Sequence, residues 1–388
     1  MRDATKTHKR VFKISRALAR PIAKWFFNYE YEPLPEIDGP ILVLCNHNTD
    51  FDCGFVAIAV KRLVYFVATE NMVRMGLWGK LLAKWFNPIL HYKGSQGTAT
   101  VKSILRRIKD GFSVCMFPEG NRSFNGLTCP IPPATGKMAK SCGATLVTYR
   151  LEGAYFTTPR WGNGIRKGKV RGVVAGVYPP ETLREMSADA VIETINRDLY
   201  EDAYGRQSIE HIKFRGRKKA EGIESTLFMC PNCRKIGALK GKGDSLGCSC
   251  GYSALYTEEG YLQTNDGRTE TITELDASQH EYVESIVAEQ TGECLFEDRV
   301  SFRVVGEDHN TVSDSEATIS AYPDRLEFAG EVLPYERIDS MSVTQRNLLT
   351  IHEESSSNRL EFTGDISFSA LKYLYAYRAV VKSVNGVL

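Results

Sequence analysis

The sequence predicts an α/β domain with a mostly parallel sheet, a small cysteine-bearing segment and an all-β domain that ends in one helix. Three observations predict it. Strand-like and helix-like segments alternate between residues 41 and about 205, residues 228–262 are Gly-rich and carry four cysteines, and short strands follow from about 316. Alternating strands and helices are typical of a parallel sheet flanked by helices.

Composition describes a globular protein of more than one domain. The chain has 388 residues, which is enough for two or three domains, and 43% of them are hydrophobic. No segment approaches the roughly 20 apolar residues of a membrane-spanning helix, and the N-terminus lacks the apolar region of a signal peptide. Ten cysteines, four of them clustered, do not suggest a disulfide framework in a chain of this size. We therefore expect a reducing, cytoplasmic compartment.

The first expected element is a basic amphipathic helix over residues 9–29, which Pro21 should divide into two short helices. Its apolar residues include Phe12, Trp25 and Phe26, with lysines and arginines between them. Such a helix can lie in a membrane interface, or it can pack on the sheet with solvated lysines. We expect the first of these, peripheral on the cytoplasmic face of a membrane.

The elements of the α/β domain follow in order. We expect strands at 41–45, 64–68, 88–92, 113–117, 144–149 and 169–177, and helices at 51–61, up to Phe86, 97–110 and 183–204. A basic stretch from Lys213 to Lys219 can contact phosphates or form a solvated helix face, and the second reading is favoured. The predicted domains are N-terminal helices at 1–30, the α/β domain at 31–222, the cysteine segment at 223–265, an unassigned linker at 266–315 and the all-β domain at 316–388.

A first motif, Asn46-His47-Asn48-Thr49-Asp50-Phe51-Asp52, follows the strand at 41–45. His47 suits a general base, because its unperturbed pKa of about 6.5 lies near working pH. Asp52 lies in the first turn of the next helix and can reach the far imidazole nitrogen, as the acid does in a serine-protease triad. Asp50 is a competing carboxylate. The alternative is that Asp52 only caps the helix.

A second motif, Phe117-Pro118-Glu119-Gly120-Asn121-Arg122-Ser123, follows the strand at 113–117. Gly120 lets the backbone approach a ligand closely, and Arg122 offers a planar fork that suits a phosphate. Glu119 can accept hydrogen bonds from substrate hydroxyls. Because sites in α/β sheets form at the carboxyl ends of strands, we expect both motifs at one edge of the sheet.

Together these motifs resemble the His-x-x-x-x-Asp and Phe-Pro-Glu-Gly-Thr-Arg-Ser signatures of the glycerolipid acyltransferases, over roughly residues 10 to 205. The resemblance implies transfer of an acyl chain from acyl-CoA or acyl-carrier protein to a lysophospholipid, most simply 1-acylglycerol-3-phosphate giving phosphatidate. It also implies that His47 is the general base, that Asp52 orients it and that no enzyme nucleophile is needed.

The resemblance further implies that the acceptor's phosphate and glycerol are bound by five residues, namely Lys93, Glu119, Gly120, Asn121 and Arg122. The chain departs from the family at Lys93, where Arg is usual, and at Asn121, where Thr is usual. The strand at 145–150 also lacks the family's proline. These departures leave the catalytic pair intact and suggest an outlying branch with an unusual acceptor.

The cysteine segment suggests a metal site. Its four cysteines form one Cys-x-x-Cys and one Cys-x-Cys pair: Cys230, Cys233, Cys248 and Cys250. Four thiolates satisfy a tetrahedral structural zinc, and without metal about 35 residues would have little core of their own. We expect a zinc ribbon. The alternative is four unligated cysteines in a small β-ribbon.

The C-terminal pattern indicates short strands at 317–321, 325–328, 348–351 and 360–362 and a helix at 368–382. Seven short strands closed by one helix resemble a pleckstrin-homology or GRAM-like domain, by pattern only.

Two other functions fit parts of the sequence. A non-catalytic lipid-binding membrane adaptor on an acyltransferase-like scaffold is disfavoured because both His47 and Asp52 are present. A zinc-ribbon nucleic-acid binder needs a concentrated basic surface, whereas the net charge is +2 and residues 281–297 are acidic. The expected partners are therefore a membrane surface, a lysophospholipid and acyl-carrier protein, without nucleic acid.

Overall fold

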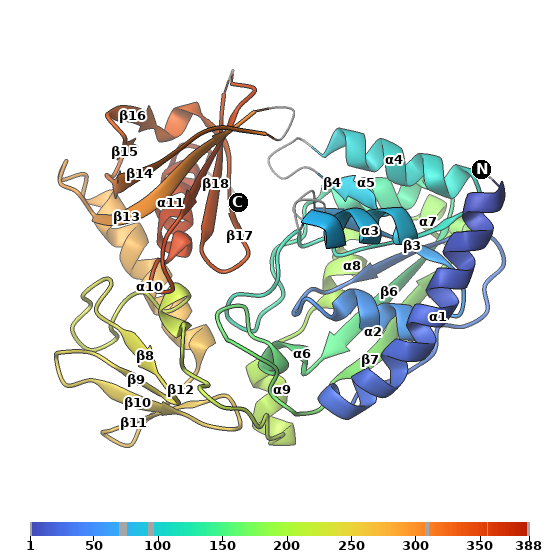
Figure 1. The fold of residues 1–388 in the computed structure, drawn as a ribbon, viewed down its shortest axis with the longest axis horizontal. Coiled ribbons are helices and arrows are strands. Elements are labelled where there is room, and N and C mark those ends of the chain that lie inside the picture. The colour runs from blue at the N-terminus through green and yellow to red at the C-terminus, as the bar shows by residue number, and fades with distance from the viewer. Residues whose placement is uncertain (1, 70–75, 92–96, 307–309, 355, 386–388) are drawn as a thin grey trace. The chain divides into compact units, whose positions relative to one another are not determined.

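The computed structural model describes residues 2–69, 76–91, 97–306, 310–354 and 356–385 (Figure 1). The chain divides into two compact units. The first comprises Met1–Pro159 with Gly164–Gly216, and the second comprises Arg160–Asn163 with Arg217–Leu388.

The first unit contains a seven-stranded sheet in the order β1-β7-β6-β2-β5-β3-β4. Its strands are β1 (Glu30–Tyr31), β2 (Ile41–Cys45), β3 (Val64–Thr69), β4 (Ile89–His91), β5 (Ser113–Met116), β6 (Thr145–Glu152) and β7 (Arg171–Tyr178). All neighbouring pairs are parallel except β6 with β7. The mostly parallel α/β fold predicted from the sequence is confirmed.

Helices cover both faces of this sheet (Figure 1). They are α1 (Arg2–Phe27), α2 (Asp52–Ala59), α3 (Gly76–Phe86), α4 (Thr98–Lys109), α5 (Ala134–Ser141), α6 (Ala154–Thr157), α7 (Pro180–Glu185), α8 (Ala188–Leu199) and α9 (Ala203–Glu210). Alternate residues of β2 enter two different cores. Val43 packs with residues of α1 and α2, and Leu42 packs with residues of α4, α5 and α8. Because both faces are covered, all of β2 is buried.

Two helix predictions are wrong. Pro21 does not divide the first helix, since α1 runs from Arg2 to Phe27 with Pro21 inside it. Proline removes one backbone donor, but the buried residues Phe12 and Phe27 keep the helix packed on the unit on either side of Pro21.

The helix predicted at 183–204 is α7, α8 and α9 instead. Side chains start the last two of these helices, because Ser187 accepts from Ala190 N–H and Asp202 accepts from Gly205 N–H.

The second unit contains two antiparallel sheets. The smaller has the order β12-β11-β10-β9-β8, and the larger has the order β16-β15-β14-β13-β19-β18-β17. The strands of the smaller sheet are β8 (Lys240–Lys242), β9 (Ser245–Gly247), β10 (Ser253–Tyr256), β11 (Leu262–Thr264) and β12 (Thr269–Glu270). The strands of the larger sheet are β13 (Phe296–Val305), β14 (Thr311–Ala321), β15 (Arg325–Phe328), β16 (Glu331–Pro334), β17 (Ile338–Thr344), β18 (Leu348–Glu353) and β19 (Arg359–Thr363). Two long helices, α10 (Ile272–Ala288) and α11 (Ala370–Asn385), belong to the same unit.

The segment predicted as an unassigned linker at 266–315 is structured. It contains β12, α10, β13 and the first part of β14, so the larger sheet begins at Phe296 and not near 316. The strand β13 is hard to recognise from the sequence because charged residues such as Arg299 and Arg303 flank its buried residues, Val300 and Phe302. None of the described helices combines the length and the apolar character that crossing a bilayer requires.

Candidate active site

The two sequence motifs meet at one edge of the parallel sheet. β2 and β5 are neighbours, with Leu44 opposite Met116, so the loops that follow them emerge side by side. Glu119 Oε1 accepts the backbone N–H of His47 at 2.6 Å. The carbonyl of His47 accepts the N–H of Ser123 at 2.9 Å. The second motif therefore binds both the backbone N–H and the backbone carbonyl of His47.

His47 and Asp52 form a hydrogen-bonded pair. The distance from His47 Nδ1 to Asp52 Oδ2 is 2.8 Å, and the Asp52 side chain has no exposed surface. Asp52 also accepts the N–H groups of Asn48 at 2.6 Å and of Thr49 at 2.9 Å, and the Thr49 hydroxyl at 2.7 Å. A carboxylate surrounded by donors acts as an acceptor toward His47 Nδ1–H as well. Because Nδ1 carries the hydrogen of this bond, Nε2 is the nitrogen of His47 that can accept a proton.

The sequence left open whether Asp52 merely caps the following helix. Phe51 is the N-cap of α2, and its side chain makes no capping bond. Asp52 instead bonds backwards, to the loop that carries His47. The imidazole ring stacks on Phe117 of the second motif, with centroids 4.5 Å apart and planes at 25°. His47 is therefore fixed through its ring as well as its backbone.

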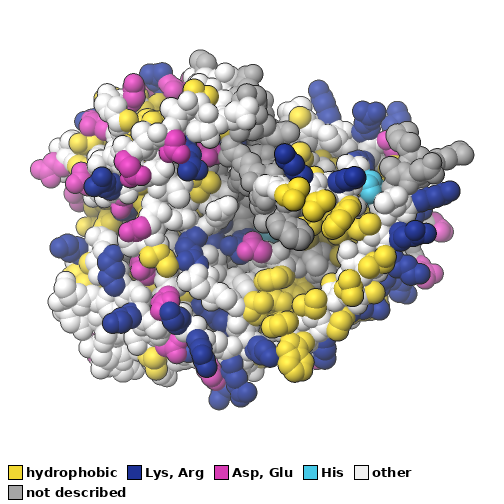
Figure 2. All heavy atoms as spheres, in the orientation of Figure 1, with side chains coloured by type: hydrophobic (Ala, Val, Ile, Leu, Met, Phe, Trp, Pro, Cys, Tyr) yellow, Lys and Arg dark blue, Asp and Glu magenta, His cyan; other side chains and the backbone are white. Residues whose placement is uncertain are grey.

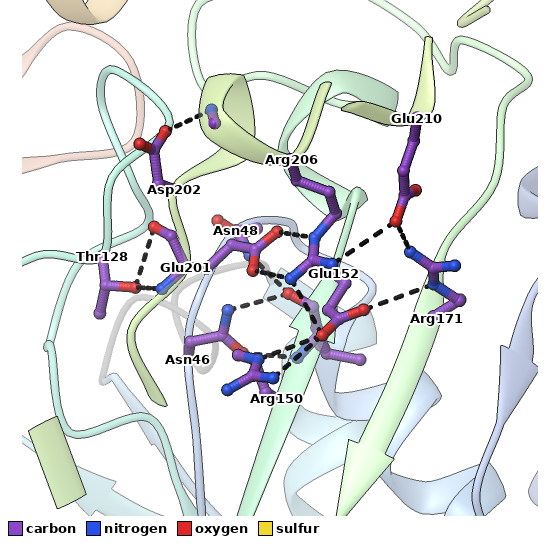
Figure 3. Close-up of polar contacts among 12 residues, drawn as sticks. Asn46, Asn48, Thr128, Arg150, Glu152, Arg171, Glu201, Asp202, Arg206 and Glu210 are labelled. Atoms are coloured by element: carbon purple, nitrogen blue, oxygen red, sulfur yellow. Dashed lines mark hydrogen bonds and ion pairs between the residues drawn. The ribbon is translucent and has the colours of Figure 1, made fainter. Parts of the chain in front are cut away.

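Asn46 anchors the same loop to the strand on the other side of β2. Its side-chain oxygen accepts Leu151 N–H at 2.7 Å, and its amide donates to Leu151 O at 2.9 Å. Asn46 is 1% exposed, so these bonds are made in the interior. Figure 3 shows Asn46 and Asn48 lying beside the end of β6. His47 thus lies between an anchor on β6 and a clamp after β5.

Next to this anchor lies a network of ion pairs (Figure 3). It joins three arginines to three carboxylates, Arg150, Arg171 and Arg206 to Glu152, Glu201 and Glu210. Glu152 is 3.0 Å from Arg206 and 3.1 Å from Arg150. Glu152 and Glu201 are buried, so removing their arginine partners would leave uncompensated charges in the interior. The network therefore stabilises the end of β6 against which Asn46 is held.

The buried side chain of Glu119 joins the loop that carries His47 to the segment at Cys129. Its second oxygen accepts Cys129 N–H at 2.6 Å, so the two oxygens hold His47 and Cys129. Burial raises the pKa of Glu119 to about 8, against the opposing effect of these two backbone bonds. A carboxylate has about four lone-pair sites. The predicted contact of Glu119 with the acceptor's glycerol would therefore be additional to these bonds.

Arg122 pairs with Asp50 across the two motifs. Its Nη1 lies 2.9 Å from Asp50 Oδ2, and the side chains are 14% and 79% exposed respectively. From the sequence alone Asp50 could also be the carboxylate partner of His47. In the structure Asp50 contacts Arg122, while Asp52 contacts His47. Gly120 is exposed in the left-handed region at φ 66°, which favours glycine. Lys93, predicted to bind phosphate, lies outside the described residues.

Residues 26–152 match the family model described as Acyltransferase. This segment contains both motifs, so the match and the resemblance of the motifs point to the same family. Among solved structures, the 1-acyl-sn-glycerophosphate acyltransferase PlsC from Thermotoga maritima is similar at 20% identity and a TM-score of 0.43, over 51% of this chain and 82% of that one. The PH and C1 domains of the Vav1 exchange factor are similar at 8% identity and a TM-score of 0.18, over 29% of this chain and 36% of that one. At these scores neither likeness carries an argument about this chain.

The four clustered cysteines converge in the second unit. Their sulfur atoms all lie within 4.8 Å of one another, with Cys230 and Cys250 at 3.6 Å and Cys233 and Cys248 at 3.8 Å. Zinc–sulfur bonds of about 2.3 Å in a tetrahedron place the sulfurs about 3.8 Å apart. The donor set therefore fits a tetrahedral zinc ion with four protein ligands.

Two tight turns bring these cysteines together. In the first, Arg234 N–H donates to Cys230 O at 2.8 Å, and in the second, Gly251 N–H donates to Cys248 O at 3.1 Å. A backbone hydrogen bond from Tyr252 lowers the pKa of Cys250 to about 6, which favours the thiolate that metals bind. Gly251, which follows Cys250 directly, takes a positive φ of 95°, a backbone conformation that glycine adopts without strain.

Sequence reasoning missed three positions of the active-site region, namely Asn46, Thr49 and Ser123. All three lie inside the two motifs and are buried polar residues. Their signal in the sequence was position, because Asn46 precedes His47, Ser123 follows Arg122 and Thr49 lies between His47 and Asp52. Their roles depend on partners far along the chain or on loop geometry, which spacing does not reveal.

Proposed function

We propose that the first unit transfers an acyl chain from an acyl thioester to the hydroxyl of a lysophospholipid, most simply 1-acylglycerol-3-phosphate giving phosphatidate. The observation that carries this proposal is the His47–Asp52 pair at the carboxyl end of β2, with both backbone groups of His47 held by the second motif. The match of residues 26–152 to the acyltransferase family supports the same reaction.

In the proposed reaction His47 Nε2 removes the proton of the acceptor hydroxyl. The hydroxyl oxygen attacks the thioester carbonyl and forms a C–O bond, and collapse of the tetrahedral intermediate breaks the C–S bond. The proton held on His47 then passes to the departing sulfur, so the base is regenerated. Asp52 stabilises the imidazolium through its bond to Nδ1. The donor is acyl-CoA or acyl-carrier protein.

For the acceptor we propose a phosphate site around Arg122 and Lys93. The guanidinium of Arg122 already binds a carboxylate, Asp50, in a charge-assisted hydrogen bond. A phosphate offers similar oxygens with more charge. Gly120 and Asn121 belong to the same loop as Arg122 and are proposed to contact the glycerol phosphate. Glu119 is proposed to bind the glycerol in addition to its two backbone bonds.

We further propose that the protein is peripheral on the cytoplasmic face of a membrane. Large apolar side chains lie exposed on α1, including Ile14, Leu18, Ile22 and Trp25. A basic helix with such a stripe can insert its apolar side chains into the headgroup region. The lipid acceptor and product would then be reached from the surface.

The four-cysteine cluster is proposed to bind one structural zinc ion and to stabilise the small sheet β8–β12. Because all four ligands come from the protein, the site leaves no open coordination position for catalysis. We also propose that the larger sheet belongs to a pleckstrin-homology or GRAM-like domain with an accessory role.

The reaction is tested with the purified full chain, labelled acyl-CoA or acyl-carrier protein, and a panel of lysophospholipids. We expect a labelled diacyl product with wild type and almost none with His47→Ala. Binding of lysophospholipid without any transfer, for every donor, would favour the adaptor function instead. Transfer at equal rates in both proteins would refute the assignment of the base.

A further inference from the structure

A second site lies at the C-terminal end of α1, apart from the His47 motif. It is a groove of about 700 Å³ formed by three segments, residues 21–28, 167–169 and 212–215. Backbone bonds hold the segments together. Lys167 and Arg215 exchange N–H···O bonds of 2.8 and 2.7 Å, and Val170 N–H donates to Phe27 O at 3.1 Å. The groove is therefore part of the folded unit and not a gap beside a loose helix.

The groove is strongly basic. Five cationic side chains line it, namely Lys24, Lys167, Lys169, Lys213 and Arg215, and among the described lining residues there is no Asp or Glu. Glu30 pairs with Lys169 at 2.8 Å. Lys213 and Arg215 belong to the basic stretch for which the sequence favours a solvated helix face. The fold places them beside α1. A concentration of like charge in a hollow attracts an anion.

Two exposed aromatic residues form the apolar wall of this groove. Trp25 is 71% and Phe26 is 39% exposed, and Lys167 Nζ lies 4.7 Å from the Trp25 ring centroid and 5.7 Å from that of Phe26. A cation over an indole leaves its remaining N–H donors available to an anion. Trp is also the residue that most often lies where an apolar phase meets water.

The aromatic wall continues as a stripe along the helix. Ile14, Leu18 and Ile22 are exposed at four-residue spacing and lead to Trp25, while Ala23 and Phe27 pack into the core on another face of α1. On the face of this unit drawn in Figure 2, hydrophobic side chains gather over α1 and α3, with Lys and Arg side chains beside them. On α3, Leu77 and Trp85 are exposed.

We propose that this groove binds the phosphate headgroup of an anionic phospholipid in a bilayer, with Trp25 and the α1 stripe inserted among the lipids. The charge of the groove selects an anion, and the adjoining stripe selects an anion that carries acyl chains. A soluble phosphate would leave the stripe in water. This proposal rests on the proposed membrane location and gives it a specific site, which includes cations that do not belong to α1.

Vesicle binding of the full chain tests the proposal without any acyl donor, so the result does not depend on catalysis. Vesicles of phosphatidylcholine are compared with vesicles that also contain phosphatidylglycerol. The double variant Lys167→Ala/Lys213→Ala is compared with Lys102→Ala/Lys109→Ala, which removes the same charge from α4 at the other end of the unit (Figure 1). Each basic residue near an anionic surface contributes about fivefold to partitioning.

Wild type should prefer the anionic vesicles. The groove variant should lose about 25-fold in partitioning onto them, and the α4 variant should lose much less. Equal losses in the two variants would show a net-charge effect and overturn the site, as would a groove variant that binds within about twofold of wild type. All four lysines are exposed, and unfolding midpoints confirm that the variants are folded.

Two further measurements separate a bilayer from a soluble phosphate. Brominated lipids should quench tryptophan fluorescence in wild type and quench it much less in Trp25→Phe. Equal quenching in both proteins would show that Trp25 does not insert among the lipids and would overturn the proposal. Glycerol phosphate, at the phosphate concentration of the vesicles, should not displace the protein. Displacement would assign the groove to a free phosphate.

Discussion

The carboxylate of Glu119 accepts the backbone N–H of His47 at 2.6 Å and so joins the two motifs of the candidate active site. Its other oxygen accepts Cys129 N–H at the same distance. Glu119 thereby fixes the backbone position of His47, in addition to any contact that Glu119 makes with substrate.

The first prediction concerns the base. His47→Ala should lower turnover by about 10²- to 10⁴-fold, the usual contribution of general-base catalysis, and added imidazole should restore part of the rate. Asp52→Asn should also lower turnover, because the orienting acceptor of Nδ1 is lost. Steady-state kinetics with and without imidazole measure both effects. Near-wild-type turnover in His47→Ala contradicts the assignment.

The second prediction concerns Arg122 and its partner. Arg122→Ala should raise the acceptor KM by about tenfold or more, because a charge-assisted hydrogen bond is lost, and should affect the donor KM less. Asp50→Asn should lower the acceptor KM by a few fold, since an exposed ion pair is weak and phosphate no longer competes with a carboxylate.

The matched control for that experiment is Asp38→Asn, which removes the same charge at another exposed position of the unit. Its acceptor KM should equal that of wild type. Equal effects of Asp50→Asn and Asp38→Asn would mean that overall charge, and not the pair with Arg122, sets the affinity.

The third prediction concerns pH and stability. Burial raises the pKa of Glu119 to about 8, above the value of about 4.3 for an unfolded glutamate. The folded state holds this proton more tightly, so the stabilisation is complete below about pH 4.3 and is lost as the pH rises through 8. Because glutamine does not titrate, the free energy of unfolding of wild type minus that of Glu119→Gln should decrease over this range. Denaturant unfolding at a series of pH values measures it, and a constant difference would be the contrary result.

The fourth prediction concerns the cysteine cluster. Elemental analysis should find about one zinc ion per chain, set by the four-thiolate site, and Cys233→Ser should reduce it. Hydrogen exchange should then show lost protection over β8–β12, with protection of β2 and β5 retained, because metal binding and folding are coupled.

Cys294 lies outside this cluster, and Cys294→Ser is the control that should keep the metal and the protection. A wild-type preparation without zinc that still shows full protection over β8–β12 would refute the structural site.

Part of the fold was predictable because it depends on local pattern. Each of the six predicted strands of the first unit has a counterpart in β2–β7, since apolar runs bounded by loops carry that information themselves. The strand β13 was not predictable in this way, because its buried and charged residues do not alternate cleanly. Pro21 misled the prediction of α1, because tertiary packing outweighs the loss of one backbone bond.

By itself the sequence determined which candidate residues lie close together along the chain. His47 and Asp52 lie five residues apart across one turn, so their meeting needs only local geometry, and local turns likewise hold Cys230 near Cys233 and Cys248 near Cys250. Tertiary structure alone decided that Glu119 holds His47, that Asp50 pairs with Arg122 and that Lys167 and Lys213 line a groove with Trp25. Such partners are far apart along the chain, and only the order of strands in the sheet and the packing of α1 bring them together.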